Sequence, residues 1–347
     1  MLFAEFKTPD GWGIPGIHGP WAADELDGNV QGAVYLIDGG EEALLFDTGN
    51  RVPGTEVSMG PSIIEKVERD GSNVKTIFVS HFHYDHTGNA AELKDRWDAE
   101  VVCHPVDRPI IEDPMIVTRA ENVERFGLSP AELLADFNLA EGESLGLSDP
   151  SQVERFWNFP VAVDREVDQG DKLQVGRFEL EVIHLPGHSP GQIGLWNPET
   201  RSLYCADVCH FPSPLVAYPL GNVQDHIDSL EKCKALAPHY LWEGHYLGAY
   251  EPAAVQRRLD HLLQQTLDTE ARVRVLLERA GGPTTIAELL PEVFPIKLEL
   301  NYPVASGNGN ERNAYAEATL QCHLRRLVEL GEAERLLEDG VTRFARA

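Results

Sequence analysis

The six-residue run HFHYDH at positions 81–86 is the feature that most constrains the fold of this chain. It follows directly on an apolar stretch with the composition of a buried strand. Side chains alternate along an extended segment, so His81 and His83 are expected to project to one side. The following turn brings Asp85 and His86 to a second position nearby. Imidazole and carboxylate groups at this spacing match the ligands that zinc binds, so one segment can supply ligands to two adjacent metal ions.

Three further ligand candidates follow later strands. His188 comes after the expected strand 178–184, Asp207 after 202–205, and His245 after 239–242. Two metal ions need more donors than one short segment supplies. The positions of these three side chains at strand ends predict that they complete the site.

Short apolar runs separated by turn signals predict the strands, and amphipathic spacing predicts the helices between them. The expected strands cover residues 33–37, 43–46, 75–79, 100–103, 178–184, 192–196, 202–205 and 239–242. The expected helices cover residues 62–69, 89–96 and 225–236. Strands interspersed with helices, neither regularly alternating nor segregated, favour a layered α/β sandwich.

Together these motifs resemble the metallo-β-lactamase superfamily. The residues that carry the resemblance are His-x-His-x-Asp-His at 81–86, Pro-Gly-His-Ser-Pro-Gly at 186–191, an aspartate at 207 and Gly-His at 244–245. The resemblance implies an α/β fold, specifically the four-layer αβ/βα sandwich of that superfamily. It also implies a metal-dependent hydrolase.

The resemblance also implies a ligand assignment. One metal ion would be held by His81, His83 and His188, and the other by Asp85, His86 and His245, with Asp207 bridging the pair. Asp47, in Phe46-Asp47-Thr48-Gly49, matches a family aspartate that orients a ligand histidine from behind. A simple turn at a strand end is the alternative for Asp47.

The cofactors implied are two divalent metal ions per chain, with Zn²⁺ as the first choice and Fe or Mn as alternatives. Two metals about 3.5–4 Å apart bring the pKa of a shared water towards about 7 and so supply a metal-bound hydroxide. Asp85 is the expected catalytic group, because it can orient that water and shuttle its proton. Tyr84, His210 and Tyr246 lie near the ligands in sequence and are candidates for an oxyanion donor. The predicted site leaves out His18, His104, His184, His226, His239, His261 and His323.

Residues 105–164 are expected to form an insertion or lid, because most of them fit no strand pattern. Helical candidates cover 119–126 and 130–137. The segment is rich in aromatic residues: Phe126, Phe137, Phe156, Trp157 and Phe159. A local core and an apolar wall over the active site are both open interpretations.

Near residue 265 the predicted elements change from strands interspersed with helices to helices followed by a hairpin. Helices are expected at 269–279, 285–290 and 313–330, followed by a hairpin formed by 333–337 and 341–344. Three helices and a hairpin resemble a small winged-helix module, and the whole chain is similar to the β-lactamase-like protein 2 group of the superfamily. The predicted domains are therefore a catalytic domain at 1–264 and a winged-helix-like domain at 265–347.

Charge argues against a nucleic-acid partner. The chain has 29 basic and 56 acidic side chains, a net charge of −27, which repels polyanions. Residues 265–347 hold ten basic and thirteen acidic side chains, a balance of −3, whereas a DNA-reading module is normally basic. We expect a small-molecule substrate with an apolar part. The absence of a signal or membrane-length apolar run predicts a cytoplasmic protein with no membrane partner, and a homo-oligomer is left open.

Three classes of function are compatible with the sequence. The leading one is hydrolysis of a small or medium carboxyl derivative, such as a thioester, ester or lactone; a phosphodiesterase or ribonuclease is the alternative hydrolase and is disfavoured by charge. The second class is a mononuclear iron dioxygenase that oxidises sulfur compounds. The third is a non-catalytic binding protein, which the complete ligand set disfavours. Metal content distinguishes the first two.

Overall fold

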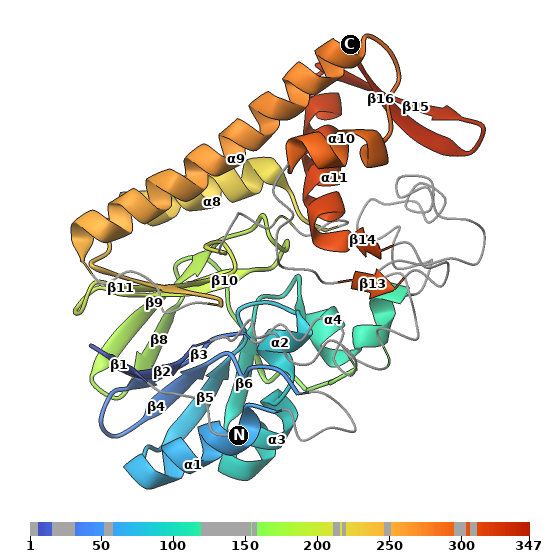
Figure 1. Ribbon diagram of the computed structural model, residues 1–347. Helices are drawn as coiled ribbons and strands as arrows, with labels where there is room; N and C mark the ends of the chain where they lie inside the picture. Colours follow the sequence, from blue (N-terminus) through green and yellow to red (C-terminus); the bar gives the residue numbers. More distant parts are fainter. Residues whose placement is uncertain are drawn as a thin grey trace.

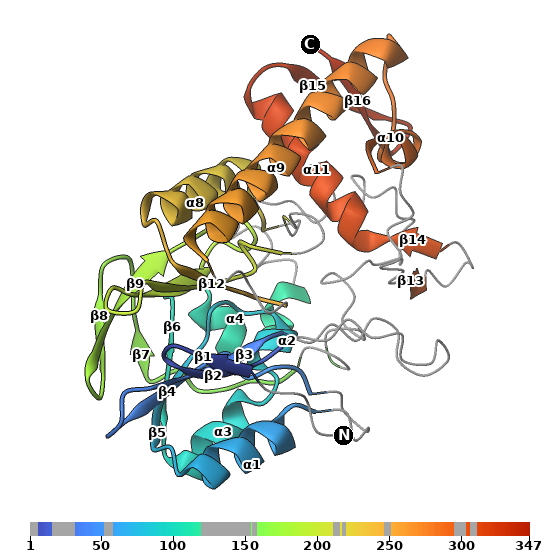
Figure 2. The same ribbon diagram turned by 60° about the vertical axis from the view of Figure 1, so that its left-hand side comes forward.

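The structure, a computed structural model, describes residues 6–15, 32–51, 58–118, 154, 158–210, 216, 220–245, 251–294, 303–305 and 311–347. Two mixed β-sheets form its main body (Figures 1 and 2). The first sheet contains, in this order, β1 (Phe6–Thr8), β2 (Gly11–Ile14), β3 (Val34–Asp38), β4 (Ala43–Phe46), β5 (Val74–Phe78), β6 (Glu100–Cys103) and β7 (Arg165–Glu166). The second contains, in this order, β12 (Tyr240–Glu243), β11 (Ser202–Ala206), β10 (Ile193–Asn197), β9 (Phe178–His184) and β8 (Lys172–Val175).

Helices cover the outer face of each sheet, which gives the body four layers (Figures 1 and 2). The helices α1 (Gly60–Asp70) and α3 (Ala90–Trp97) pack against the first sheet. The helices α8 (Val223–Ala235) and α9 (Pro252–Ala280) pack against the second. Two short helices, α2 (Tyr84–Thr87) and α4 (Arg108–Glu112), and the 3₁₀-helix η1 (Pro114–Thr118) lie in the loops after β5 and β6.

The central strands β3, β4, β10 and β11 are buried on both faces. In β3, Tyr35 and Ile37 pack between the two sheets, whereas Val34 and Leu36 pack on the side of α1 and α3. Because side chains alternate along a strand, a strand covered on both sides needs an apolar residue at nearly every position. This explains the continuous apolar runs in the sequence and confirms the layered α/β sandwich that they predicted.

The loops that carry polar side chains leave the sheets at one edge. β4, β5 and β6 are parallel, so the segments that follow them emerge together. In the second sheet β11 and β12 are parallel, and β9 has the same direction as β11 because both are antiparallel to β10. The carboxyl ends of six strands therefore supply one site, as is common for ligand sites in α/β folds.

Most expected elements are present. The strands and helices predicted within 33–103 and 178–242 agree with the structure to within two residues at each end. The sequence did not reveal β1, β2, β7 and β8, which are short and rich in glycine or charged residues. The helical candidates 119–126 and 130–137 lie outside the described residues, as does much of the predicted insertion 105–164.

The C-terminal helices and hairpin are also present. They are the end of α9, α10 (Ile286–Val293), α11 (Ala314–Glu329) and the hairpin β15 (Ala333–Glu338) and β16 (Val341–Arg346), with a second short pair, β13 (Pro303–Ala305) and β14 (Glu311–Asn313). The helix expected at 269–279 is the second half of the 29-residue α9. Its first half packs on the second sheet and its second half on α10 and α11, so one helix serves two cores. The predicted boundary at 264 lies inside α9, and the division into two domains stays a prediction.

The buried carboxylate of Glu270 links α9 to α11. Glu270 pairs with Arg326 of α11 and lies 2.7 Å from Arg274. Burial would raise the pKa of Glu270, but the neighbouring His323 imidazole and Arg326 guanidinium outweigh it and lower the pKa to about 2. Ionised Glu270 therefore stabilises the fold above its unfolded pKa near 4.5, and this contribution is lost as the pH falls through about 2.

We predict that Glu270→Gln lowers the free energy of unfolding by about 2 kcal/mol at pH 7, because it removes a charge-assisted hydrogen bond. The difference between variant and parent should shrink as the pH falls from about 4.5 towards 2. Denaturant unfolding at a series of pH values measures it. A difference that is constant across this range would show that the charge of Glu270 contributes no stability.

The five cysteines are buried free thiols. Burial raises the pKa of the Cys322 thiol to about 12, which keeps it protonated and unreactive. Among the described residues, no helix has the length and apolar character needed to cross a membrane.

Candidate metal centre

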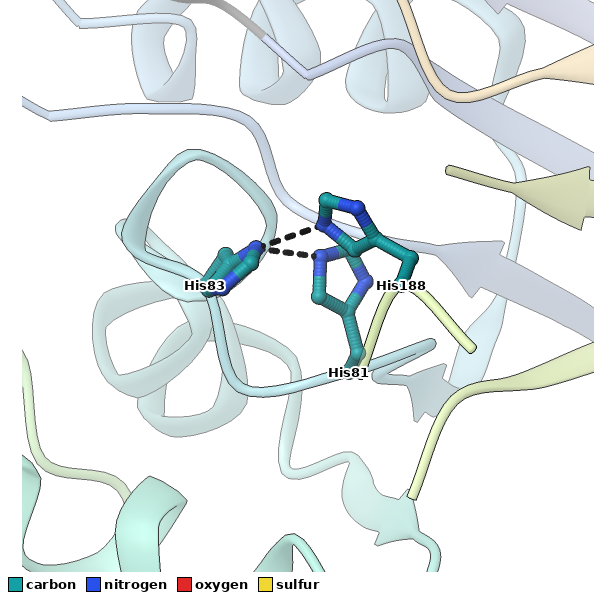
Figure 3. A group of neighbouring side chains, drawn as sticks. All are labelled: His81, His83 and His188. Atoms are coloured by element: carbon teal, nitrogen blue, oxygen red, sulfur yellow. Dashed lines mark hydrogen bonds between the residues drawn. The ribbon is translucent and has the colours of Figure 1, made fainter. Parts of the chain in front are cut away.

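Three histidines form the first group of the site. His81 and His83 follow β5, and His188 follows β9. The Nδ1 atom of His83 lies 3.0 Å from Nε2 of His81 and 2.9 Å from Nε2 of His188 (Figure 3). Nitrogens that share a tetrahedral zinc ion at about 2.05 Å stand about 3.3 Å apart, so this triangle is close to the size of one metal site.

The second group contains Asp85, His86 and His245. His83 is extended and ends the strand-like segment, and α2 then turns Asp85 and His86 away from it. Asp85 Oδ2 lies 3.6 Å from Nε2 of His86 and 3.5 Å from Nε2 of His245. All three side chains are buried. The separation into two groups along one segment is what the spacing of the sequence predicted.

Asp207 lies between the two groups. Its Oδ2 is 3.4 Å from Nε2 of His188 and 3.0 Å from Nε2 of His245, and its Oδ1 is 3.3 Å from Nε2 of His86. One carboxylate therefore faces histidines of both groups. The structure thus brings together all seven side chains that were predicted as ligands.

The electrostatics of the site favour bound cations. Burial, followed by the neighbouring imidazoles, holds the pKa values of His81 and His83 well below the usual value, so both rings are neutral and offer lone pairs. Burial would also lower the pKa of His86, but the carboxylates of Asp207 and Asp85 outweigh it and raise that pKa well above normal. The same negative charges would attract a divalent cation.

Two buried polar atoms support the fit to metal ions. Nε2 of His86 and Oδ1 of Asp207 lie 3.3 Å apart, but within the described part of the chain neither atom makes a hydrogen bond. Burying unpaired polar atoms is costly, and coordination of a cation by both atoms would remove that cost. The donor set of neutral imidazoles and carboxylates is the one that zinc and similar divalent ions prefer. The residues therefore fit two metal ions.

Asp47 contacts the Nδ1 atom of His86 directly and that of His81 through the Ser80 hydroxyl. Its Oδ2 accepts hydrogen bonds from Nδ1 of His86 at 2.7 Å and from the Ser80 hydroxyl at 2.8 Å, and its Oδ1 accepts from the Ser80 backbone N–H at 2.8 Å. The Ser80 hydroxyl in turn lies 2.9 Å from Nδ1 of His81. Protons on these Nδ1 atoms leave both Nε2 atoms free to face the centre. The position expected for Asp47 agrees with the structure, whereas sequence reasoning missed Ser80.

Glycines in the site motifs allow the ligand loops to approach one another. A Cβ on Gly244 would overlap Oδ1 of Asp207, and a Cβ on Gly187 would overlap the backbone of His226. Gly187 also has φ +132°, which other residues rarely adopt. These positions explain why glycine precedes both His188 and His245.

We predict that Gly244→Ala weakens metal binding by roughly 10-fold or more, because its methyl group displaces the Asp207 carboxylate. The control is Gly282→Ala, since a Cβ there meets no atom within 4 Å. Competition with a chromophoric chelator measures the affinities. Equal affinity in both variants would show that Asp207 has room to move without cost.

One further histidine, His210, lies beside the candidate centre. A ring nitrogen of His210 lies within 4.8 Å of ligand atoms of Asp207 and His245, so His210 borders the centre. Tyr84 is buried in α2, between His83 and Asp85 in the sequence, and Tyr246 lies outside the described residues. The structure thus leaves His210 and Tyr84 as candidates for contact with a substrate.

A separate group, His104, Asp168 and His184, is held by hydrogen bonds. His104 Nδ1 accepts from the Val106 backbone N–H at 3.2 Å, and its Nε2 lies 3.2 Å from Asp168 Oδ1. The His184 ring stacks on that of His104 with centroids 4.3 Å apart and an interplanar angle of 12°. Nearly parallel rings do not direct two lone pairs at one ion. The predicted site leaves out both histidines, and their ring nitrogens contact Asp168, the Val106 N–H and the Pro190 carbonyl oxygen.

Comparison with known families decides the assignment. Residues 27–245 match the family described as the Metallo-beta-lactamase superfamily, and this range contains every side chain of the site. The chain belongs to the metallo-beta-lactamase superfamily. The resemblance found in the sequence is therefore confirmed, and so is the expectation of a hydrolase fold with clusters of histidine and aspartate that suit two metal ions.

Two curated relatives within the metallo-beta-lactamase superfamily have named activities. An acyl-coenzyme A thioesterase, MBLAC2, from Gallus gallus is 24% identical over 218 residues, or 61% of this chain and 72% of the relative. A hydroxyacylglutathione hydrolase, GloC, from Haemophilus influenzae is 26% identical over 181 residues, or 51% of this chain and 69% of the relative.

Two solved metallo-beta-lactamase structures extend over almost the whole chain. A family protein from Thermus thermophilus has a TM-score of 0.71 at 21% identity and covers 96% of this chain and 97% of its own. A beta-lactamase domain protein from Burkholderia ambifaria has a TM-score of 0.71 at 21% identity and covers 100% of this chain and 96% of its own. The fold they share with this chain includes the C-terminal helices.

Proposed function

We propose that this protein hydrolyses the thioester bond of a small or medium-sized acyl compound at a centre of two divalent metal ions, zinc being the first choice. The position of Asp207 carries this proposal, because its two carboxylate oxygens face histidines of both groups at 3.0 to 3.4 Å. A carboxylate in this position can bridge two metal ions.

The residues would divide the work as follows. His81, His83 and His188 would hold one ion, Asp85, His86 and His245 the other, and Asp207 would join them. When bound, the two ions lower the pKa of water and polarise the carbonyl oxygen of the substrate. Asp85, between His86 and His245, would orient the attacking water and accept its proton at a carboxylate oxygen. Asp47 and Ser80 would keep the imidazole rings of His86 and His81 in their binding orientation.

The substrate class rests on the relatives. The curated names of both relatives above, an acyl-coenzyme A thioesterase and a hydroxyacylglutathione hydrolase, describe hydrolysis of thioesters. At identities near 25% the substrate itself does not carry over, so the shared bond is what we propose. The net charge of −27 disfavours a nucleic-acid substrate.

A substrate panel tests this function. Zinc-loaded protein is assayed on acyl-coenzyme A, hydroxyacylglutathione, a p-nitrophenyl ester, a lactone and a phosphodiester, with chelated protein as the control. We expect the largest kcat/KM on a thioester and loss of turnover after chelation. Turnover of the phosphodiester alone, or oxygen consumption with a thiol and iron in place of hydrolysis, would contradict the proposal.

A further inference from the structure

Asp107 is a buried carboxylate that contacts two ligand-bearing loops at once. It is 1% exposed and follows β6, which lies beside β5 in the first sheet. Its Oδ2 accepts a hydrogen bond from the backbone N–H of Phe82 at 3.2 Å and lies 3.5 Å from the hydroxyl of Ser189. Phe82 stands between His81 and His83, and Ser189 follows His188. Through Phe82 and Ser189, Asp107 is therefore linked to the chain segments that carry all three histidines of the first group.

The local sequence suggests a different role for Asp107. It occupies the N-cap of α4 and is followed by Arg108 and Pro109, a pattern typical of a capping aspartate. In the structure its side chain makes no capping hydrogen bond; only its backbone carbonyl starts the helix, accepting from Ile110 and Ile111 at 3.0 Å. The carboxylate is directed at the ligand loops instead.

The backbone around this carboxylate leaves no spare room. A Cβ on Gly191, in the loop after His188, would overlap Oδ1 of Asp107 and lie 2.9 Å from its backbone nitrogen. The last glycine of the Pro-Gly-His-Ser-Pro-Gly motif is therefore required by the approach of Asp107. Burial raises the pKa of Asp107 to about 7, although the N–H groups of Phe82 and Gly191 and the Ser189 hydroxyl lower it. Because the pKa is raised on balance, these contacts offset only part of the free-energy cost of burying the charged carboxylate.

We propose that Asp107 is a positioning residue that fixes the distance between the His81–His83 segment and the His188 loop, and thereby sets the geometry of the three-histidine metal site. The two segments come from different sheets, and between their flanking residues one backbone hydrogen bond is made, from the Ile193 N–H to the Ser80 carbonyl oxygen at 2.9 Å. Asp107 supplies a common anchor for both. The inference rests on the proposed metal centre, whose ligands it would align.

The test compares full-length Asp107→Asn and Ser189→Ala with the parent chain. In Asp107→Asn an amide of the same size removes the negative charge and so weakens the hydrogen bonds that Oδ2 accepts from the Phe82 N–H and the Ser189 hydroxyl. The matched control is Glu112→Gln, the same change at an exposed carboxylate of α4. The readouts are zinc affinity by chelator competition, the visible absorption spectrum after cobalt(II) loading, and thermal unfolding of the metal-free protein.

We expect Asp107→Asn to weaken zinc binding by roughly 10- to 100-fold and to shift the cobalt(II) bands, with a smaller change of the same kind in Ser189→Ala and none in Glu112→Gln. If the variants only unfold at a lower temperature, with zinc affinity and cobalt(II) spectrum equal to the parent, the residue is structural and the inference is wrong. If Asp107→Asn does not fold, Ser189→Ala decides in the same way. Failure of the parent itself to bind zinc would instead refute the proposed function.

Discussion

Replacement of Asp207 by alanine is expected to lower kcat/KM for thioester hydrolysis by about 10³-fold or more, since loss of one metal ion removes several kcal/mol of transition-state stabilisation. Oδ1 of Asp207 faces His86, and Oδ2 faces His188 and His245. No other side chain among the seven contacts both groups through two different oxygens. The variant should bind fewer metal ions per chain while retaining its fold, because the carboxylate lies at the edge of the sheets.

The control for this prediction is Asp228→Asn, on the exposed side of α8. Steady-state kinetics and metal analysis are made on both proteins after the same zinc loading. We expect the control to match the parent. An Asp207→Ala protein that keeps its full zinc content and its kcat/KM would refute the bridging position of Asp207.

Replacement of Asp47 by asparagine is expected to weaken metal binding or activity by roughly 10- to 100-fold. Both oxygens of Asp47 accept hydrogen bonds, from the Ser80 N–H on one side and from the Ser80 hydroxyl and His86 Nδ1 on the other. An amide has one acceptor oxygen, so in either orientation its NH₂ group meets a donor. Asparagine also tolerates the left-handed backbone at this position, where φ is 59°. The loss should therefore come from the ring orientation of His86 and His81.

A graded series checks this explanation. Ser80→Ala removes the hydroxyl between Asp47 and His81 but leaves the contact from Asp47 to His86, so its effect should be smaller than that of Asp47→Asn. Zinc affinity by competition and kcat/KM are measured for each variant. Parent-like values for Asp47→Asn would mean that the ring orientations are fixed by packing alone.

The sequence was informative about the site because four of the seven proposed metal ligands lie within six consecutive residues. Four donors within positions 81–86, placed after a buried strand, predicted two metal positions from side-chain alternation and the turn that follows it. His188, Asp207 and His245 were found because each follows an apolar run that forms a strand. The strands themselves were visible because both faces of each sheet are covered, which requires continuous apolar sequence.

Other parts of the site could not be predicted, because they depend on which strands are neighbours. Ser80 and Asp107 are ordinary polar residues at strand ends, and only the parallel pairing of β4, β5 and β6 brings them beside the ligands. Asp107 in particular has the sequence pattern of a helix cap. The continuity of α9 was missed because two polar residues, Thr266 and Glu270, occupy its buried face between the apolar residues that pack on the two cores.

The central claim is a two-ion centre that hydrolyses a thioester, and a zinc titration of activity tests it most directly. Chelated full-length protein receives increasing equivalents of zinc, and hydrolysis of an acyl-coenzyme A or acylglutathione is followed at each step. We expect activity to rise to a plateau at about two equivalents per chain, as a dinuclear site requires. A plateau at one equivalent would contradict the two-ion centre, and no hydrolysis at any zinc level would contradict the proposed reaction.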